Sequence, residues 1–376
     1  MTRIVDSFNN PYNDDKLIEA CALFGMMNLS GRRFGVKDPL KAISNMRERS
    51  NGLGAGFAIY GLYPEHENDY ALHIMYLNME ARERAEMLIR ENFDVLEAEE
   101  IPVNPEAKVW RPPSLWRYFV QPKKGATNIS SHDDYVLENV MRINTKSKGA
   151  FVFSSGKNMG VFKGVGFPED IAEYFCLDEY KGYMWICHTR FPTNTPGWWG
   201  GAQPFNILDW SVIHNGELSS YGTNRRYLEM HGYYCTMQTD SEVITYALDL
   251  LMRKHKLPIE VVAKIFAPPF WFEIDSMTPK ERSFYTALRQ CYSNLLLNGP
   301  FTIIVARTGE MIGLADRIKL RPLVAGIKDD VFYLSSEEAA IRLVSPHLDK
   351  VWYPRAGEPV IARLKSAEPL ETLATP

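Results

Sequence analysis

The sequence predicts a layered protein of the α+β class, in which two sheets pack against each other and helices cover them. Short apolar runs that read as strands recur along the chain, most densely as four runs between residues 302 and 334. Helical stretches separate the earlier runs and dominate residues 219–292. Strands interleaved with helices favour a layered architecture around a shared core.

The first part of the chain alternates strands with helices. A strand follows Cys21, and a helix begins at Asp38-Pro39, because aspartate suits the N-cap and proline the first helical position. In order, we expect a strand over 21–27, a helix over 38–49, strands over 55–60 and 70–77, and a helix over 80–91. Residues 101–114 hold four prolines and read as a loop. We treat 62–135 as an elaboration of the scaffold.

The second part begins with a predicted hairpin, since two apolar runs flank the turn-forming stretch 154–158. Proline interrupts the helical region at Pro258 and again at 267–269. The expected elements are a hairpin of 151–153 and 159–162, a strand over 183–187, helices within 219–292, strands over 302–306, 311–315, 323–326 and 331–334, and a helix over 336–344.

Composition and charge restrict the class of protein. The 376 residues are 45% hydrophobic and carry a formal net charge of -4, which gives no support to nucleic-acid binding. The five cysteines are widely spaced without a Cys-x-x-Cys pair, so the sequence suggests neither a zinc site nor an iron–sulfur cluster. Residues 1–20 are rich in charge and do not resemble a signal peptide, and no run of 18 apolar residues occurs. We expect a cytoplasmic protein.

Three polar clusters follow strand-like segments at regular intervals. Arg190, Asn215 and Asp240 mark them, each 25 residues from the next. Arginine suits the α-carboxylate of an amino acid and aspartate suits its α-ammonium group. Asn215 and Gly216 suit an oxyanion hole, with one side-chain and one backbone N–H donor. With Cys21 as a thiol nucleophile, the set fits attack on a carboxamide or ester of an amino acid.

Each of these features also has a purely structural interpretation. Cys21 on an apolar strand is compatible with an inert core cysteine. His214-Asn215-Gly216 is compatible with a type I′ hairpin turn, and Asp240-Ser241-Glu242 with a capped helix start. Arg190 would then be an ion-pair partner. The occurrence of all of these features in one chain, in this order, favours the functional interpretation.

The motifs resemble those of class II glutamine amidotransferases, which are N-terminal-nucleophile hydrolases, and most closely the amidotransferase domain of glutamate synthase. The resemblance covers most of 21–345. The matching segments are Cys21-Ala22-Leu23-Phe24-Gly25, His188-Thr189-Arg190-Phe191-Pro192-Thr193-Asn194-Thr195 with Ala202-Gln203-Pro204-Phe205, His214-Asn215-Gly216-Glu217, Thr239-Asp240-Ser241-Glu242, Asp316-Arg317-Ile318-Lys319-Leu320-Arg321-Pro322 and Ser335-Ser336-Glu337.

The resemblance implies a four-layer α/β/β/α sandwich with two mostly antiparallel sheets, and hydrolysis of L-glutamine to glutamate and ammonia. It also implies the site residues. Cys21 is the expected nucleophile, with its own α-amino group as general base after removal of a leader, residues 1–20, from the domain of 21–376. Asn215 and Gly216 are expected to hold the oxyanion, Arg190 and Thr193 the substrate carboxylate, and Asp240 the ammonium group. Arg49 is expected to lie just behind these residues.

Two departures from the family pattern concern the surroundings of the nucleophile. Ala22 stands where the family has glycine, and the segment Met46-Arg47-Glu48-Arg49-Ser50 lacks the family's histidine and glycine. The chain has no flavin or iron–sulfur region. We therefore expect no cofactor in this chain, and expect ammonia to pass to a glutamate-synthase-type partner that binds flavin mononucleotide and carries the iron–sulfur cluster. A subunit of a related enzyme that aminates another acceptor is the alternative.

Two other functions compete with this interpretation. A non-catalytic regulatory or scaffolding subunit would bind glutamine without hydrolysing it, and both the departure at Ala22 and retention of the leader before Cys21 would support it. An enzyme with its own sugar-phosphate or nucleotide acceptor site is disfavoured, because no glycine-rich phosphate loop follows the amidotransferase region. The intact mass of the chain discriminates the first rival from an active enzyme, which should begin at Cys21 rather than Met1.

Overall fold

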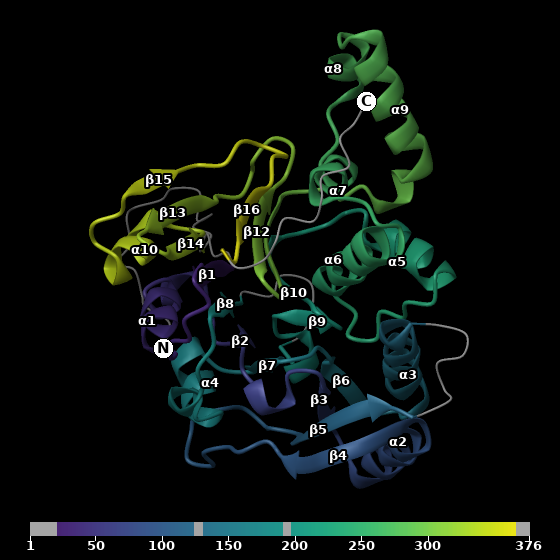
Figure 1. Cartoon of the computed structure of the whole chain (residues 1–376), viewed down its shortest axis with the longest axis vertical. Coiled ribbons are helices and arrows are strands. Elements are labelled where there is room, and N and C mark those ends of the chain that lie inside the picture. The colour runs from purple at the N-terminus through teal and green to yellow at the C-terminus, as the bar shows by residue number, and fades with distance from the viewer. Residues whose placement is uncertain (1–20, 124–130, 191–196, 366–376) are drawn as a thin grey trace, which may run out of the picture.

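The fold is described from a computed structural model, which describes residues 21–123, 131–190 and 197–365 (Figure 1). The predicted leader over 1–20 and the predicted carboxylate ligand Thr193 lie outside the described residues.

One large sheet contains the strand that follows Cys21. Its seven strands run in the order β15-β13-β14-β1-β8-β2-β7, and all neighbours pair antiparallel. Their bounds are β1 (Ala22–Asn28), β2 (Ala55–Tyr60), β7 (Met159–Gly164), β8 (Met184–Thr189), β13 (Val324–Lys328), β14 (Val331–Ser335) and β15 (Lys350–Trp352). The central strands β1, β2 and β8 are buried along their whole length, which explains their continuous apolar runs.

A second antiparallel sheet faces the first. Its order is β16-β12-β11-β10-β9, formed by β9 (Phe205–Ile207), β10 (Trp210–Gly216), β11 (Phe301–Arg307), β12 (Glu310–Ala315) and β16 (Val360–Arg363). The two sheets approach closely at Gly25 of β1, where an added Cβ would lie 2.7 Å from the Met311 Sδ and 3.4 Å from a methyl carbon of Ile304. Glycine here therefore permits close contact between the sheets.

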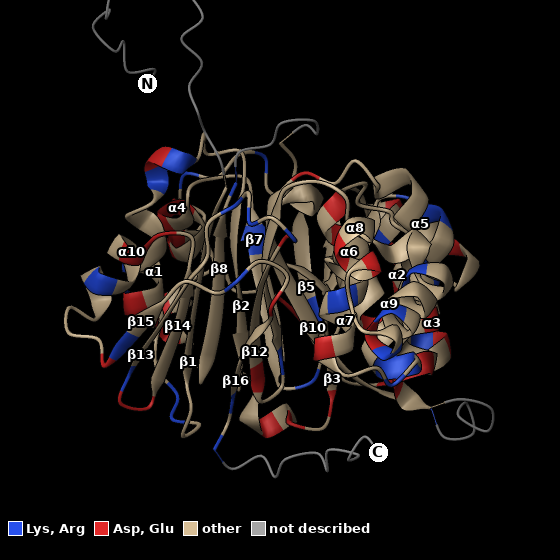
Figure 2. Ribbon diagram, turned by 90° about the horizontal axis from the view of Figure 1, so that it is seen from above, with Lys and Arg blue, Asp and Glu red and all other residues tan. Residues whose placement is uncertain are grey.

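Helices cover the two outer faces of this pair of sheets. The first sheet is covered by α1 (Lys37–Ser44), α4 (Pro168–Tyr174) and α10 (Glu338–Val344). The second is covered by α5 (Tyr221–Met230), α6 (Asp240–Leu248) and α7 (Ile259–Phe266). Figure 2 shows the four layers in succession. The predicted α/β/β/α sandwich is confirmed.

A third sheet, which the sequence analysis did not predict, extends the sandwich. Its order is β4-β5-β3-β6, from β3 (Tyr70–Tyr76), β4 (Phe93–Glu100), β5 (Ser114–Pro122) and β6 (Ala150–Ser154), and it packs with α2 (Met79–Asn92) and α3 (His132–Lys146). The edge strand β4 is mostly exposed and rich in glutamate, so it lacks the apolar alternation that signals a strand. Much of 62–135 therefore has regular structure.

The predicted hairpin of 151–153 and 159–162 is wrong, because β6 and β7 belong to different sheets. The stretch between them bonds to other segments instead: the Ser155 N–H donates to Asn206 Oδ1, and the Gly156 carbonyl accepts from the Ala71 N–H. The helix predicted over 38–49 begins at Lys37 and ends at Ser44, so Asp38 lies in the first turn and is not the N-cap.

The helical region 219–292 has the breaks that the prolines predict. Pro258 is the N-cap of α7, and the break at 267–269 separates α7 from α8 (Trp271–Asp275) and α9 (Pro279–Cys291). These two helices project from the body of the molecule (Figure 1). Among the described residues, none of the helices has the length and apolar character needed to cross a membrane.

Candidate active site

Cys21 and Arg190 lie side by side at one end of the first sheet. Ala22 at the start of β1 pairs with Thr189 at the end of β8, so the residues just outside these strands are neighbours. Successive side chains alternate between the faces of a sheet. The alternation places Cys21 and Arg190 on the same face as Leu23 and His188, the residues of the preceding pair.

Asn215 and Gly216 lie at the end of β10, in the opposing sheet. Ile213 belongs to the core shared with β1 and β8, whereas Val212 belongs to the core on the helical side. Asn215 is two residues from Ile213 and shares its face, so it faces the space between the two sheets. Asn215 pairs with Thr302 and Gly216 with Phe301 in the β10–β11 ladder. The pair is therefore the end of a strand and does not form the hairpin turn that the sequence allowed.

Two features of Asn215-Gly216 suit recognition of an oxyanion. The Asn215 side chain is only 1% exposed, and its Nδ2 has no hydrogen-bond partner among the described residues. A buried amide donor left without a partner costs free energy, so its position calls for a ligand. Gly216 has a φ of 154°, and an added Cβ would lie 2.0 Å from the Pro300 carbonyl oxygen, so only glycine fits.

The Arg190 backbone is held by the turn before β2. Its N–H donates to the Gly54 carbonyl over 2.8 Å, and its carbonyl accepts from the Ser50 hydroxyl. The side chain is 5% exposed and lies against two glycines, because an added Cβ would be 3.2 Å from its Cδ at Gly54 and 2.9 Å from Nη1 at Gly201. Burial lowers the pKa of Arg190, and the nearby Cys21 and Asp240 act in the opposite direction. The structure thus brings these three predicted residues together.

Asp240 is the first residue of α6, and Thr239 is its N-cap, with a hydroxyl that accepts from the Glu242 N–H. The helix start that the sequence allowed is therefore present. The Asp240 carboxylate nevertheless remains about a quarter exposed, with Oδ2 accepting from the Leu218 N–H and Oδ1 lying 3.8 Å from His214 Nδ1. A helix N-terminus stabilises this negative charge. A capping role and a binding role are compatible at this position.

Arg49 contacts the backbone of the candidate nucleophile. Its Nε lies 3.4 Å from the Cys21 carbonyl oxygen, and its Nη1 donates to Glu337 over 2.6 Å. The neighbouring Ser336 forms two hydrogen bonds with the Leu23 backbone: its N–H donates to the Leu23 carbonyl, and its hydroxyl oxygen accepts from the Leu23 N–H. The segment after β14 therefore anchors the start of β1.

Gln203 has a role that the sequence analysis did not assign. Its amide accepts from the His214 N–H over 2.6 Å and donates to the His214 carbonyl, so it satisfies both backbone groups of that residue. Its Nε2 also lies 3.1 Å from the Ser241 hydroxyl. Gln203 therefore joins the end of β10 to the start of α6. The only signal in the sequence was its place in the Ala202–Phe205 motif.

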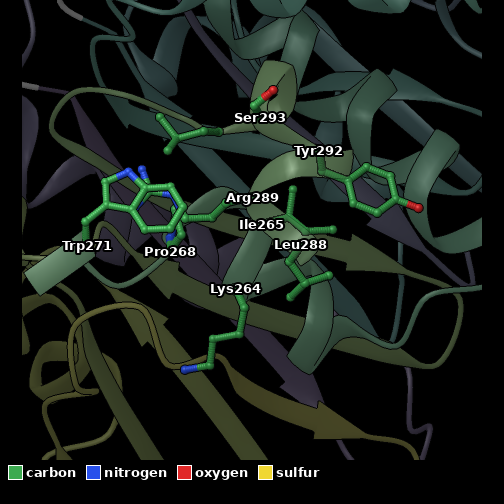
Figure 3. Close-up of a pocket in the computed structure, with 9 residues that line it drawn as sticks. Lys264, Ile265, Pro268, Trp271, Leu288, Arg289, Tyr292 and Ser293 are labelled. Carbon is green, nitrogen blue, oxygen red and sulfur yellow. The ribbon is translucent and has the colours of Figure 1, made fainter. Parts of the chain in front are cut away.

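A cavity elsewhere in the molecule does not involve the predicted site residues. It measures about 280 Å³ and lies between α7, α8 and α9, with Trp271 and Arg289 in its wall (Figure 3). Within the described part of the chain, no group of three or more His, Cys, Asp or Glu residues is arranged to hold a metal ion.

The arrangement at the end of the sandwich combines a thiol, a buried amide donor, a guanidinium and a carboxylate. These groups can bind the two charged ends of an amino acid and stabilise an oxyanion between them. Three of the four come from strand ends in two rigid, facing sheets, which fixes their relative positions.

Comparison with known proteins identifies the family. The family model described as "Glutamine amidotransferases class-II" matches residues 60–351, which include Arg190, Asn215, Gly216 and Asp240 but begin after Cys21 and Arg49. A protein of Archaeoglobus fulgidus, named only as uncharacterized, is 63% identical over 358 residues, which cover 94% of this chain and 95% of that protein.

Two further matches are more distant. A protein of Methanothermobacter thermautotrophicus, provisionally named a glutamine amidotransferase, is 27% identical over 86% of this chain and 93% of that protein. The solved structure of a glutamine phosphoribosylpyrophosphate amidotransferase from B. subtilis, complexed with ADP and GMP, is 14% identical with a TM-score of 0.44; the match covers 92% of this chain and half of that one. The extent of the family match shows that this chain belongs to the class II glutamine amidotransferases.

Proposed function

We propose that this chain hydrolyses L-glutamine to glutamate and ammonia through a thioester on Cys21, and that the ammonia passes to a glutamate-synthase-type partner subunit. One observation carries the hydrolytic part of the proposal. The buried Asn215 amide nitrogen has no partner among the described residues and shares the space between the sheets with Cys21 and Arg190. A thiol facing an unsatisfied donor suits attack on a carbonyl.

Substrate recognition in the proposed reaction uses the two ends of glutamine. Arg190 binds the α-carboxylate, together with Thr193, and Asp240 binds the α-ammonium group. This places the side-chain carboxamide toward Cys21, since the charged residues hold the opposite end of the molecule. The guanidinium is buried, so the α-carboxylate of the substrate compensates its positive charge better than water would.

The first chemical step forms the thioester. The α-amino group of Cys21 takes the thiol proton, and the thiolate adds to the carboxamide carbon. An α-amine titrates at about pH 8, so it can accept a proton near neutrality. Asn215 Nδ2 and the Gly216 N–H stabilise the oxyanion. The carbon–nitrogen bond then breaks, and the amine returns its proton to the departing ammonia.

The second step regenerates the enzyme. Water adds to the thioester carbonyl, the same two donors stabilise the second oxyanion, and glutamate leaves as the Cys21 thiol is restored. Arg49 supports both steps by holding the Cys21 carbonyl. The mechanism requires cleavage between Ala20 and Cys21, because only then does Cys21 have an α-amine.

The partner in the proposal carries the reductive chemistry. Its support is the glutamate-synthase form of the motif around Arg190. Flavin mononucleotide and an iron–sulfur cluster are assigned to that subunit, which would use the ammonia. Glutaminase activity should then increase when the partner is added.

The proposal is tested by the intact mass of the purified protein together with its rate of ammonia release from glutamine. We expect a chain that begins at Cys21 and an activity that Cys21→Ala abolishes. Retention of Met1 with glutamine binding but no hydrolysis would support a non-catalytic regulatory subunit instead. Glutamine-dependent synthesis by the complex that survives Cys21→Ala would contradict the proposed route.

A further inference from the structure

A lysine lies in the buried space beneath the candidate site. Lys163 on β7 pairs with Gly56, which also pairs with His188 on β8. These three residues share one face of the sheet, so Lys163 projects between the two sheets on the same side as Cys21 and Arg190. Lys163 has an exposed fraction of 0%. A fully buried lysine is rare unless its charge is compensated.

The Lys163 ammonium group has one oxygen acceptor among the described residues, the Gly200 carbonyl, at 3.1 Å. The remaining contacts are soft: Met237 Sδ lies at 3.8 Å and the centroid of the Phe205 ring at 4.3 Å. Burial lowers the pKa of Lys163 to about 7, Glu242 raises it, and Arg190 lowers it.

Glu242 is the negative group that faces this lysine. It is 1% exposed and lies on α6, two residues after Asp240. Its carboxylate accepts from the backbone N–H groups of 236–238 and from the Tyr246 hydroxyl. Burial raises the pKa of Glu242 to about 7, against these hydrogen bonds and Lys163. The charged groups near Lys163 are thus Glu242 on α6 and Arg190 after β8.

Gly200, whose carbonyl accepts from Lys163, is followed directly by Gly201, which lies against Arg190. Gly200 and Gly201 form the end of a short turn over Trp199–Gly201. Gly201 lies so close to the guanidinium that an added Cβ would be 2.9 Å from Arg190 Nη1. Gly54 lies against the aliphatic stem of the same arginine, where an added Cβ would be 3.2 Å from Arg190 Cδ. A bond from Lys163 to Gly200 therefore restrains the surface on which the guanidinium rests.

We propose that Lys163 is a positioning residue, whose ammonium group holds the Trp199–Gly201 turn against Arg190 and so aims the guanidinium at the α-carboxylate of glutamine. The inference rests on the proposed glutaminase function. It adds to that reaction a residue, Lys163, that does not contact the reacting atoms. Loss of the ammonium group frees the turn and lowers the affinity for glutamine. The thiol at Cys21 is left in place.

The test compares Lys163→Met with Lys148→Met, which makes the same substitution at an exposed lysine. Methionine keeps the length and the apolar stem and removes the ammonium group. Steady-state glutaminase assays give kcat and KM, and the rate of iodoacetamide alkylation of Cys21 reports the thiol without needing a carboxylate. For Lys163→Met we expect KM to rise about 10- to 100-fold, since a misaimed guanidinium weakens the binding of substrate and transition state alike. The value of kcat and the alkylation rate should change less than about threefold.

A merely structural role predicts a different pattern, in which kcat and the alkylation rate fall together with the melting temperature. That pattern, or an unchanged KM, would overturn the inference. Gly201→Ala provides a second approach if Lys163→Met does not fold, because its Cβ would lie 2.9 Å from Arg190 Nη1 and 2.8 Å from Trp198 Nε1, and so crowds the guanidinium while Lys163 remains. Gly201→Ala should also raise KM and leave kcat unchanged. An unchanged KM in this variant would contradict the inference as well. A wild-type protein without glutaminase activity would refute the proposed function itself.

Discussion

The side-chain amide of Asn215 provides the sharpest test of the proposed chemistry, through the substitution Asn215→Ala. In the folded protein its Nδ2 donates to no acceptor among the described residues, so its removal breaks no hydrogen bond of that nitrogen. In the proposed transition state the same nitrogen donates to the oxyanion. The substitution should therefore affect the reaction much more than the fold.

The expected magnitude follows from that difference. Removal of one oxyanion-hole donor lowers kcat by about 10²- to 10³-fold, or about 2.7–4 kcal/mol of transition-state stabilisation. KM should change little, because Arg190 and Asp240 hold the charged ends of the substrate. The loss of unfolding free energy should be smaller than for a buried asparagine whose amide nitrogen is hydrogen-bonded, since Nδ2 of Asn215 has no partner to lose among the described residues.

Asn206→Ala is the matched control, because Asn206 lies in the same sheet but has a fully used amide nitrogen. Its Nδ2 lies within 3.1 Å of the carbonyls of Leu208 and Trp210 and the hydroxyl of Ser211. Its loss should cost about 1–3 kcal/mol of unfolding free energy and leave kcat nearly unchanged. Ammonia release and urea unfolding measure both quantities. A fall in kcat of less than tenfold for Asn215→Ala, or a loss of stability like that of Asn206→Ala, would refute the reasoning.

Three further predictions concern the backbone, the acid side of the stability curve and the support of the nucleophile. Gly216→Ala should lower the unfolding free energy in urea titrations by more than Gly232→Ala does. Both glycines have a positive φ, but an added Cβ would lie 2.0 Å from a carbonyl oxygen at Gly216 and would have no atom within 4 Å at Gly232. Equal losses would contradict the clash. Burial lowers the pKa of His73 to about 3, so between pH 6.5 and 3 the unfolded chain binds a proton that the folded chain excludes. The contribution of His73 to the unfolding free energy is therefore fully present above pH 6.5 and is lost on acidification, by up to about 1.4 kcal/mol per pH unit. His73→Gln should make the unfolding free energy, measured by urea unfolding at several pH values, depend less on pH. Arg49→Lys keeps the positive charge but not both contacts, with Cys21 and with Glu337, so kcat should fall about 2- to 10-fold. Glu337→Gln should lower kcat by a similar factor, and the double variant should lower it no further. Additive effects in the glutaminase assay would show that the two residues act separately.

The strands with continuous apolar runs could be predicted from the sequence, and so could the breaks in the helical region. The run after Cys21 and the four runs beyond residue 301 correspond to β1, β11, β12, β13 and β14. Pro258 is the N-cap of α7, which agrees with the predicted break. These five strands are buried over most of their length, so their composition alone identifies them. The charged edge strand β4 has no such signal, because solvent rather than the core surrounds it.

Pairing between distant segments could not be predicted in the same way. The stretch between β6 and β7 contains residues typical of a hairpin turn, yet its polar groups bond to Ala71 and Asn206. A local pattern describes which conformations a turn allows, and tertiary contacts decide which of them is used. The mutual support of Lys163, Gly200 and Arg190 is another case, since the lysine is simply one polar residue in an apolar run of the sequence.

The sequence by itself therefore determined the types of residue at the candidate site: a thiol, an arginine, an Asn-Gly pair and an aspartate, each at the edge of an element. The tertiary structure decided how they meet. Strand alternation aims Cys21, Arg190 and Asn215 into one space, and the glycine at 216 permits the backbone to end there. The physical reason is that side-chain chemistry is local, whereas register and the facing of two sheets depend on contacts between residues far apart in the chain.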